Sequence, residues 1–157
     1  MLMTDQIVMT FAQSVIDGIR ENIATKQVGG RPPMNSSGKA IDSLYYKWDG
    51  HTLIIGSTWE FITVLEDGRK PGKMPPREAL ADYVDKKPID GGMSRESLAY
   101  LIQRSIGEKG TLLYRDGGHS GILSDYLNED YIQENLIDKL RDNIVVILTD
   151  SILNRAA

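Results

Sequence analysis

Cysteine is absent from the 157-residue sequence, and this absence excludes disulfide bonds, thiolate metal ligands and thiol nucleophiles. Histidine is almost as scarce, because His51 and His119 are the only two and lie far apart in the chain. A zinc site would have to combine them with carboxylates. The Asp and Glu residues show no spacing typical of metal ligands. We therefore expect no metal, no cofactor and no catalytic residues.

Long apolar runs are missing as well. No stretch approaches the ~18 apolar residues that a membrane-spanning helix needs. The first residues also lack the positive segment and apolar run that are typical of a secretory leader. We expect a protein that is made in the cytoplasm, stays there and has no membrane partner.

Neither sign of charge dominates the sequence. The net charge of −4 gives no general attraction to polyphosphate, which leaves only a local basic patch as a means of binding nucleic acid. The chain is 41% hydrophobic and 25% charged, which is the balance of an ordinary globular protein. Its length suits one domain, and we assign residues 1–157 to it.

Helical periodicity marks the two ends of the chain. Apolar residues recur every three or four positions over residues 4–26 and again over 129–154, which predicts two long helices. The first stripe consists of Val8, Phe11, Val15, Ile19 and Ile23. The second consists of Ile132, Leu136, Leu140, Ile144, Ile147 or Leu148, and Ile152. We expect both stripes to face the core.

A β-hairpin is predicted between these helices. Residues 44–48 and 52–56 are rich in aromatic and β-branched side chains, and Asp49-Gly50 between them predicts a tight turn with positive φ at both positions. Residues 36–44 predict one or two helical turns before it, whereas residues 59–65 fit a helix as well as a strand. We expect an α+β fold, in which a small antiparallel sheet of three or four strands packs against the long N-terminal and C-terminal helices.

Proline and glycine divide the middle of the chain. Residues 69–76 contain three prolines and a glycine, which predicts a stiff exposed loop. A helix is predicted over residues 77–87, and a break follows at 88–92. Ser94 and Gly110 then cap and end another predicted helix. Residues 111–125 predict a loop with a short strand or turn at 112–114.

Two motifs resemble catalytic or nucleotide-binding loops only superficially. The glycine-rich run 68–73 is too short for a phosphate-binding loop, Pro71 removes a backbone donor, and Met74 stands where serine or threonine is required. Ser120 lies between His119 and a glycine but does not match a nucleophile elbow. Both segments are better interpreted as surface loops.

The stiff loop carries a local basic patch formed by Arg69, Lys70, Lys73 and Arg77. Such a patch suits an acidic protein partner, nucleic acid or solubility alone. The prolines lower the entropic cost of docking, and Met74 tolerates varied contacts, so a protein partner is favoured.

The loop lies within an ordered set of short motifs. An apolar segment ends in Glu66-Asp67-Gly68, and the proline-rich loop and a helix follow. Ser37-Gly38-Lys39-Ala40 lies upstream in a predicted short helix, and Lys109-Gly110-Thr111 ends a predicted helix downstream. This order resembles that of the tail-completion or neck proteins of long-tailed bacteriophages, in which Thr/Ser-Gly-x-Leu forms a short helix and Lys-Gly-Thr ends a later one. The resemblance covers about residues 36–111.

The resemblance implies a structural virion protein rather than an enzyme. It would form a ring of identical subunits at the head-tail junction, contact portal, connector or tail-tube proteins, and let DNA pass only as cargo through the channel. The residues expected to contact partners are Glu66, Arg69, Lys70, Pro71, Lys73, Met74, Pro75 and Arg77.

Two other functions remain open at this point. One is a nucleic-acid-binding module that combines the basic loop with Tyr83 or Trp59. The other is a hydrolase with an unrecognised carboxylate site. Salt-dependent DNA affinity would favour the first, and metal-dependent turnover the second.

Overall fold

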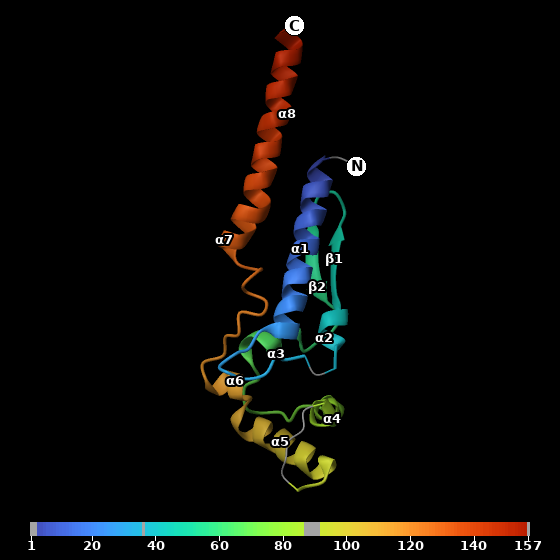
Figure 1. Ribbon diagram of the computed structural model, residues 1–157, viewed down its shortest axis with the longest axis vertical. Helices are drawn as coiled ribbons and strands as arrows, with labels where there is room; N and C mark the ends of the chain where they lie inside the picture. The colour runs from blue at the N-terminus through green and yellow to red at the C-terminus, as the bar shows by residue number, and fades with distance from the viewer. Residues whose placement is uncertain (1–2, 36, 87–91, 157) are drawn as a thin grey trace.

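The computed structural model describes residues 3–35, 37–86 and 92–156, and Figure 1 shows how its elements are arranged. Most of the predicted break at 88–92 and the last residue of the helix predicted over 77–87 lie outside the described residues. The elements are α1 (Met3–Thr25), α2 (Lys39–Asp42), β1 (Leu44–Trp48), β2 (Leu53–Ser57), α3 (Ile62–Asp67), α4 (Arg77–Lys86), α5 (Arg95–Lys109), α6 (Leu112–Arg115), α7 (Glu129–Ile132), the π-helical turn η1 (Gln133–Ile137) and α8 (Asp138–Ala156).

Helix α1 is the central element of the fold. The predicted stripe is confirmed, because its five residues are all buried, and Ala12, Ile16 and Gly18 are buried beside them. In Figure 1, α1 lies between the hairpin on one side and the chain of α7, η1 and α8 on the other. A wide apolar face of this kind fits a helix that is covered on more than one side.

The hairpin is confirmed, but its turn and the size of the sheet differ from the prediction. β1 and β2 pair antiparallel from Leu44↔Ser57 to Trp48↔Leu53, so four residues, 49–52, connect them, one more than the predicted strands leave. Gly50 has φ 95° and Asp49 has no positive φ. The Asp49 carboxylate instead accepts hydrogen bonds from the backbone N–H groups of His51 and Thr52. Among the described residues the sheet has two strands and not the expected three or four.

The missing strands are helical turns. Residues 62–67, which fit both patterns, form α3, and residues 112–115 form α6 rather than a strand. Thr111 caps α6, because its hydroxyl accepts a hydrogen bond from the backbone N–H of Tyr114. A side-chain cap of this type stabilises a short helical turn that apolar periodicity alone does not reveal.

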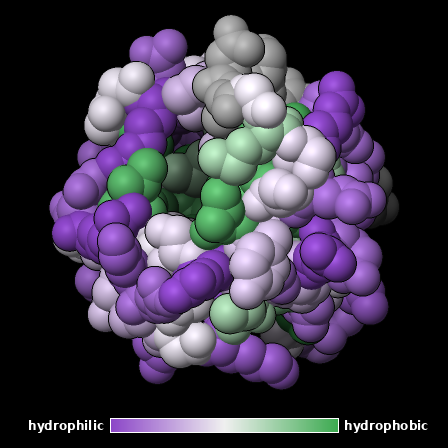
Figure 2. Space-filling view, turned by 90° about the horizontal axis from the view of Figure 1, so that it is seen from below, coloured by the Kyte–Doolittle hydropathy of each residue, from purple (hydrophilic) through white to green (hydrophobic). Residues whose placement is uncertain are grey.

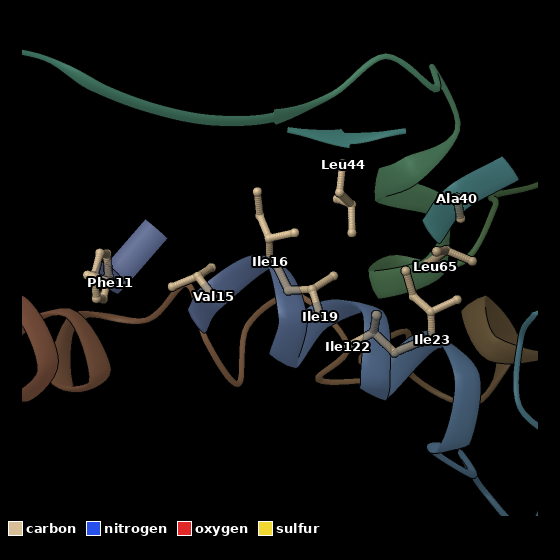
Figure 3. Packing of buried hydrophobic residues seen from close by; sticks show 9 residues of the cluster. All are labelled: Phe11, Val15, Ile16, Ile19, Ile23, Ala40, Leu44, Leu65 and Ile122. Atoms are coloured by element: carbon tan, nitrogen blue, oxygen red, sulfur yellow. The ribbon is translucent and has the colours of Figure 1, made fainter. Parts of the chain in front are cut away.

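The main core lies where α1 meets α2, α3 and the hairpin (Figure 3). Its buried residues are Phe11, Val15, Ile16, Ile19, Ile23, Ala40, Leu44, Leu65 and Ile122. Ile122 reaches this core from the long loop between α6 and α7, and it is fully buried. The loop therefore forms part of the core rather than lying on the surface.

A second, smaller core joins α4 to α5 at the lower end of the molecule in Figure 1. Leu80, Val84 and Ala99 are buried there, and Tyr83, Leu98, Ile102 and Ile106 pack around them. The Ser94 hydroxyl caps α5 by accepting a hydrogen bond from the N–H of Ser97, and Gly110 ends the helix with φ 78°. Both signals for α5 are thus confirmed.

The C-terminal helix is confirmed in extent, but its predicted packing is wrong beyond its first turns. Tyr131, Ile132 and Leu136 are half-buried against the main core. Farther along, Ile144, Ile147 and Leu148 are each about half exposed, at 53%, 49% and 57%. Figure 1 shows the reason, because the last part of α8 extends beyond the start of α1, and no other element of the described residues lies beside it there.

Because of this difference in burial, we expect two substitutions in the same helix to change the stability by different amounts. Leu136→Ala should lower the free energy of unfolding by about 2 kcal/mol, at the low end for a core leucine, because the side chain is only half-buried. Ile144→Ala should change it by less than about 0.5 kcal/mol in a monomeric sample, because the side chain is exposed. Urea denaturation of dilute protein measures both. Equal losses would show that the end of α8 packs on the same subunit.

Candidate interaction site

The loop of residues 69–76 is held against α5 and Thr111 by hydrogen bonds of its backbone. The N–H of Thr111 donates to the carbonyl of Arg69 at 2.8 Å, and the N–H of Arg69 donates to the Thr111 hydroxyl at 2.9 Å. The N–H of Gly72 donates to the carbonyl of Gly107 at 2.8 Å. The loop is therefore fixed at its start and at its middle.

The end of the loop is fixed in the same way. The Gln103 side chain donates to the carbonyl of Pro75 at 2.7 Å, and Pro75 is buried. A Cβ atom at Gly107 would lie 2.9 Å from Cγ of Met74, and one at Gly110 would lie 2.6 Å from the carbonyl oxygen of Arg69. Only glycine at these two positions lets the loop approach α5 so closely.

Five of the eight residues predicted to contact partners are exposed on this loop and at the start of α4. They are Lys70, Pro71, Lys73, Met74 and Arg77. Met74, 44% exposed, presents an apolar surface among cationic side chains. Arg69 is half-buried, and its guanidinium donates to the carbonyl of Lys73 at 3.1 Å. Arg69 therefore stabilises the loop between residues 69 and 73, and the buried Pro75 attaches the end of the loop to α5.

Glu66 has a role inside the subunit rather than on the surface where we expected it. The residue is buried, and its carboxylate accepts hydrogen bonds from the loop before α7. The donors are the N–H of Leu123 at 2.7 Å, the hydroxyl of Ser124 at 2.6 Å, the N–H of Gly121 at 3.2 Å and the hydroxyl of Ser120 at 3.4 Å. Glu66 thus holds in place the loop that carries Ile122.

The ionisation of Glu66 reflects this environment. Burial opposes the charged form, but the hydrogen bonds from Ser124, Leu123 and Gly121 outweigh burial and hold the pKa of the Glu66 carboxyl below its ordinary value. The carboxylate is therefore the stable form in the folded chain. Sequence reasoning missed this role, because the donors lie more than fifty residues away from Glu66.

His119, Ser124 and Glu66 lie close together, which invites comparison with a hydrolase triad. His119 Nε2 lies 3.3 Å from the Ser124 hydroxyl, and His119 Nδ1 lies 3.3 Å from the Glu66 carboxylate. However, the Ser124 hydroxyl donates its single proton directly to Glu66 at 2.6 Å. A triad requires that proton to point to the histidine. The arrangement braces a loop and supplies no activated nucleophile.

The aromatic residues of the nucleic-acid alternative are engaged in the two cores. Trp59 packs against the main core and stacks edge to face on Phe61, with ring centroids 5.8 Å apart. Tyr83 packs against the core between α4 and α5. Base stacking needs an accessible ring face, and both rings are half-buried. Both rings therefore contribute to the cores, and only part of each ring is left for stacking.

A cleft of about 250 Å³ lies beside the end of the loop, between α2, the start of α3 and α4. Pro76, Trp59 and Phe61 line it together with Lys39 and Asp82, whose side chains form an ion pair at 3.0 Å. Figure 2 shows the end of the molecule that α4 and α5 form, where apolar residues edge a hollow and hydrophilic residues surround it. The loop thus adjoins a surface that is partly apolar.

Within the described ranges, no group of three or more histidine, aspartate or glutamate side chains is placed to hold a metal ion. No helix in that part of the chain is long and apolar enough to span a membrane. The chain matches no protein-family model, no curated protein and no solved structure.

Proposed function

We propose that this chain is a structural subunit of a bacteriophage neck, where identical copies form a ring at the head-tail junction. The observation that supports this role is the fixed cationic loop. Its backbone is bound to Thr111 at its start and to α5 at its middle and its end, while Lys70, Lys73, Met74 and Arg77 remain exposed. A loop that is ordered before binding loses little entropy when it docks.

A ring also requires each subunit to present two different surfaces, because the contacts are head to tail. The basic loop is a further surface, proposed for contacts with the rest of the neck rather than within the ring. Its partner would be an acidic surface of a portal, connector or tail-tube protein. DNA would pass through the channel as cargo, and the net charge of −4 disfavours its retention.

We expect that reversing charges on the basic loop prevents incorporation into phage particles without unfolding the protein. Lys70→Glu combined with Lys73→Glu should change the free energy of unfolding by less than about 1 kcal/mol, because both side chains are exposed. The same variant should fail to enter phage particles, as measured by its amount in purified virions. Arg69 is left unchanged because its guanidinium braces the turn.

The matched control is Lys47→Glu combined with Arg115→Glu, which makes the same change in charge at exposed positions elsewhere. It should enter particles normally. Electron microscopy of purified virions locates the wild-type protein, and its absence from the head-tail junction would overturn the neck role. Steep salt-dependent binding to DNA, lost in the loop variant alone, would favour the nucleic-acid module instead.

A further inference from the structure

Five consecutive apolar residues of α8 are exposed. Their exposed fractions are 53% for Ile144, 55% for Val145, 56% for Val146, 49% for Ile147 and 57% for Leu148. Neighbouring residues of an α-helix point about 100° apart, so five in succession surround the helix. We call residues 144–148 the apolar belt.

The belt lies on the part of α8 that extends beyond α1 (Figure 1). A helix that is apolar on all sides is normally buried on all sides. In addition, Ile144, Val145, Val146 and Ile147 are β-branched and have low intrinsic helix propensity. A short helical extension of this composition is marginal unless other helices cover it. The belt therefore needs a covering partner.

The charges below the belt indicate that the partner is a second copy of this chain. Acidic and basic residues are mixed in one stretch of helix, in the order Asp138, Lys139, Arg141 and Asp142, and Arg141 already pairs with Asp138 in its own chain. If two copies of α8 lie side by side in parallel, belt meets belt. Each residue then lies level with its own copy, and a residue of opposite charge lies one helical step away, about 1.5 Å along the axis. Asp138 thus lies near the height of the neighbour's Lys139, and Arg141 near that of its Asp142. A partner with one sign of charge would leave half of these residues unmatched.

The distribution of the belt around the helix indicates how many copies are needed. One neighbouring helix covers a stripe roughly 100° wide, so a simple pair would leave most of the belt in water. A cyclic assembly gives every helix two neighbours. Ile144 and Ile147 are three residues apart, and isoleucine at both core positions of parallel helices favours three or four strands over two.

We propose that the apolar belt is an oligomerisation site, at which α8 packs in parallel against α8 of two neighbouring copies in a cyclic assembly of three or more subunits. This inference does not rest on the neck role and does not involve the basic loop. It includes Ile144 and Ile147, which sequence periodicity had assigned to the core of the monomer.

Sedimentation measurements of mass test the proposal with a closely matched pair of variants. Ile147 is 49% exposed and Ile54, on β2, is 50% exposed. Ile147→Glu should weaken association at least tenfold, whereas Ile54→Glu, opposite Lys47 in the hairpin, should leave the mass of at least three subunits unchanged. A monomeric wild type, or equal effects of both variants, overturns the proposal. Circular dichroism checks that each variant is folded.

A third variant tests whether both sides of the helix are used. Val145 points roughly 200° away from Ile147 around α8, so Val145→Glu should dissociate the assembly as well. If only one of the two substitutions acts, the contact is one-sided and the cyclic arrangement is wrong.

The Lys70→Glu and Lys73→Glu variant should keep its mass. Dissociation of that variant, with Ile147→Glu unaffected, would assign oligomerisation to the loop and overturn the belt.

Cross-linking tests the parallel orientation. Because the chain has no cysteine, Ser151→Cys introduces a single thiol at an exposed position just beyond the belt. In parallel neighbours this thiol lies near its own copy, and mild oxidation should give disulfide-linked pairs. Thr52→Cys in the exposed hairpin loop is the control and should give none. Equal cross-linking of both, or none at residue 151, overturns parallel packing.

Discussion

Replacement of Glu66 by glutamine is expected to lower the free energy of unfolding by about 2–4 kcal/mol, because an amide cannot accept all the hydrogen bonds that the carboxylate accepts. Its NH₂ group would face the N–H of either Leu123 or Gly121, and each of these groups now donates to one carboxylate oxygen. The exposed Glu134→Gln is the control and should be nearly neutral. Urea denaturation at neutral pH measures both. A neutral Glu66→Gln would show that the loop of residues 119–124 is held by other contacts.

The same substitution should also change the response to acid. The pKa of Glu66 is lower in the folded chain than in the unfolded chain. The unfolded state therefore binds the proton first as the pH falls. The stabilisation from Glu66 is complete above the ordinary glutamate pKa and is lost as the pH falls through the lower folded-state value. The wild type should thus lose more stability than Glu66→Gln between neutral and acid pH. Parallel curves for the two proteins would contradict this assignment.

Gly18→Ala is expected to destabilise the protein by about 1–3 kcal/mol, although alanine normally stabilises a helix interior. Gly18 is buried in α1, and a Cβ atom there would lie 2.3 Å from Cε1 and Cζ of the Tyr126 ring. That ring also packs edge to face on Tyr131, with centroids 5.3 Å apart, which limits how far it can move. Thermal unfolding measures the change.

A double-mutant cycle separates this contact from other effects of the substitution. In a Tyr126→Ala background the space above Gly18 is empty, so Gly18→Ala should no longer destabilise the helix and should stabilise it by up to about 1 kcal/mol. If alanine costs the same in both backgrounds, the contact with Tyr126 is not the cause.

The elements that could be predicted from the sequence are those with local signals. The apolar spacing of α1 identified its buried face, and Ser94 with Gly110 identified both ends of α5. The hairpin was recognisable from its composition, but its turn was not. The Asp49 carboxylate accepts hydrogen bonds two and three residues ahead, which closes a four-residue loop that an Asp-Gly pair alone does not predict.

Features that depend on distant residues could not be predicted. Gly18 leaves room for the ring of Tyr126, and Glu66 accepts hydrogen bonds from donors between Ser120 and Ser124. No local sequence pattern links either residue to its partner. The basic loop was correctly placed as an irregular segment. Its attachment depends on backbone groups of Gly107 and Thr111. Side-chain periodicity does not reveal hydrogen bonds between backbone groups.

The apolar end of α8 shows a second limit of prediction from apolar spacing. A spacing of three and four residues predicts an apolar face, but it does not say whether that face meets its own subunit or another one. Leu136 and Ile144 belong to the same stripe, yet only Leu136 reaches the core. What separates them is the length of α1, because α8 continues beyond the point where its neighbour begins.

The long loop that carries Ile122 has a consequence for how the chain folds during synthesis. The Asn22 side chain donates to the carbonyl of Ile122 across 100 residues of sequence, and Lys26 pairs with Asp125 across 99. A ribosome adds about 5–20 residues each second, so α1 waits roughly 5–20 s for these partners. The hairpin emerges earlier and covers only part of α1. The turns α2 and α3 also emerge earlier, so only the part of α1 that Ile122 covers stays exposed in the nascent chain until the loop is made.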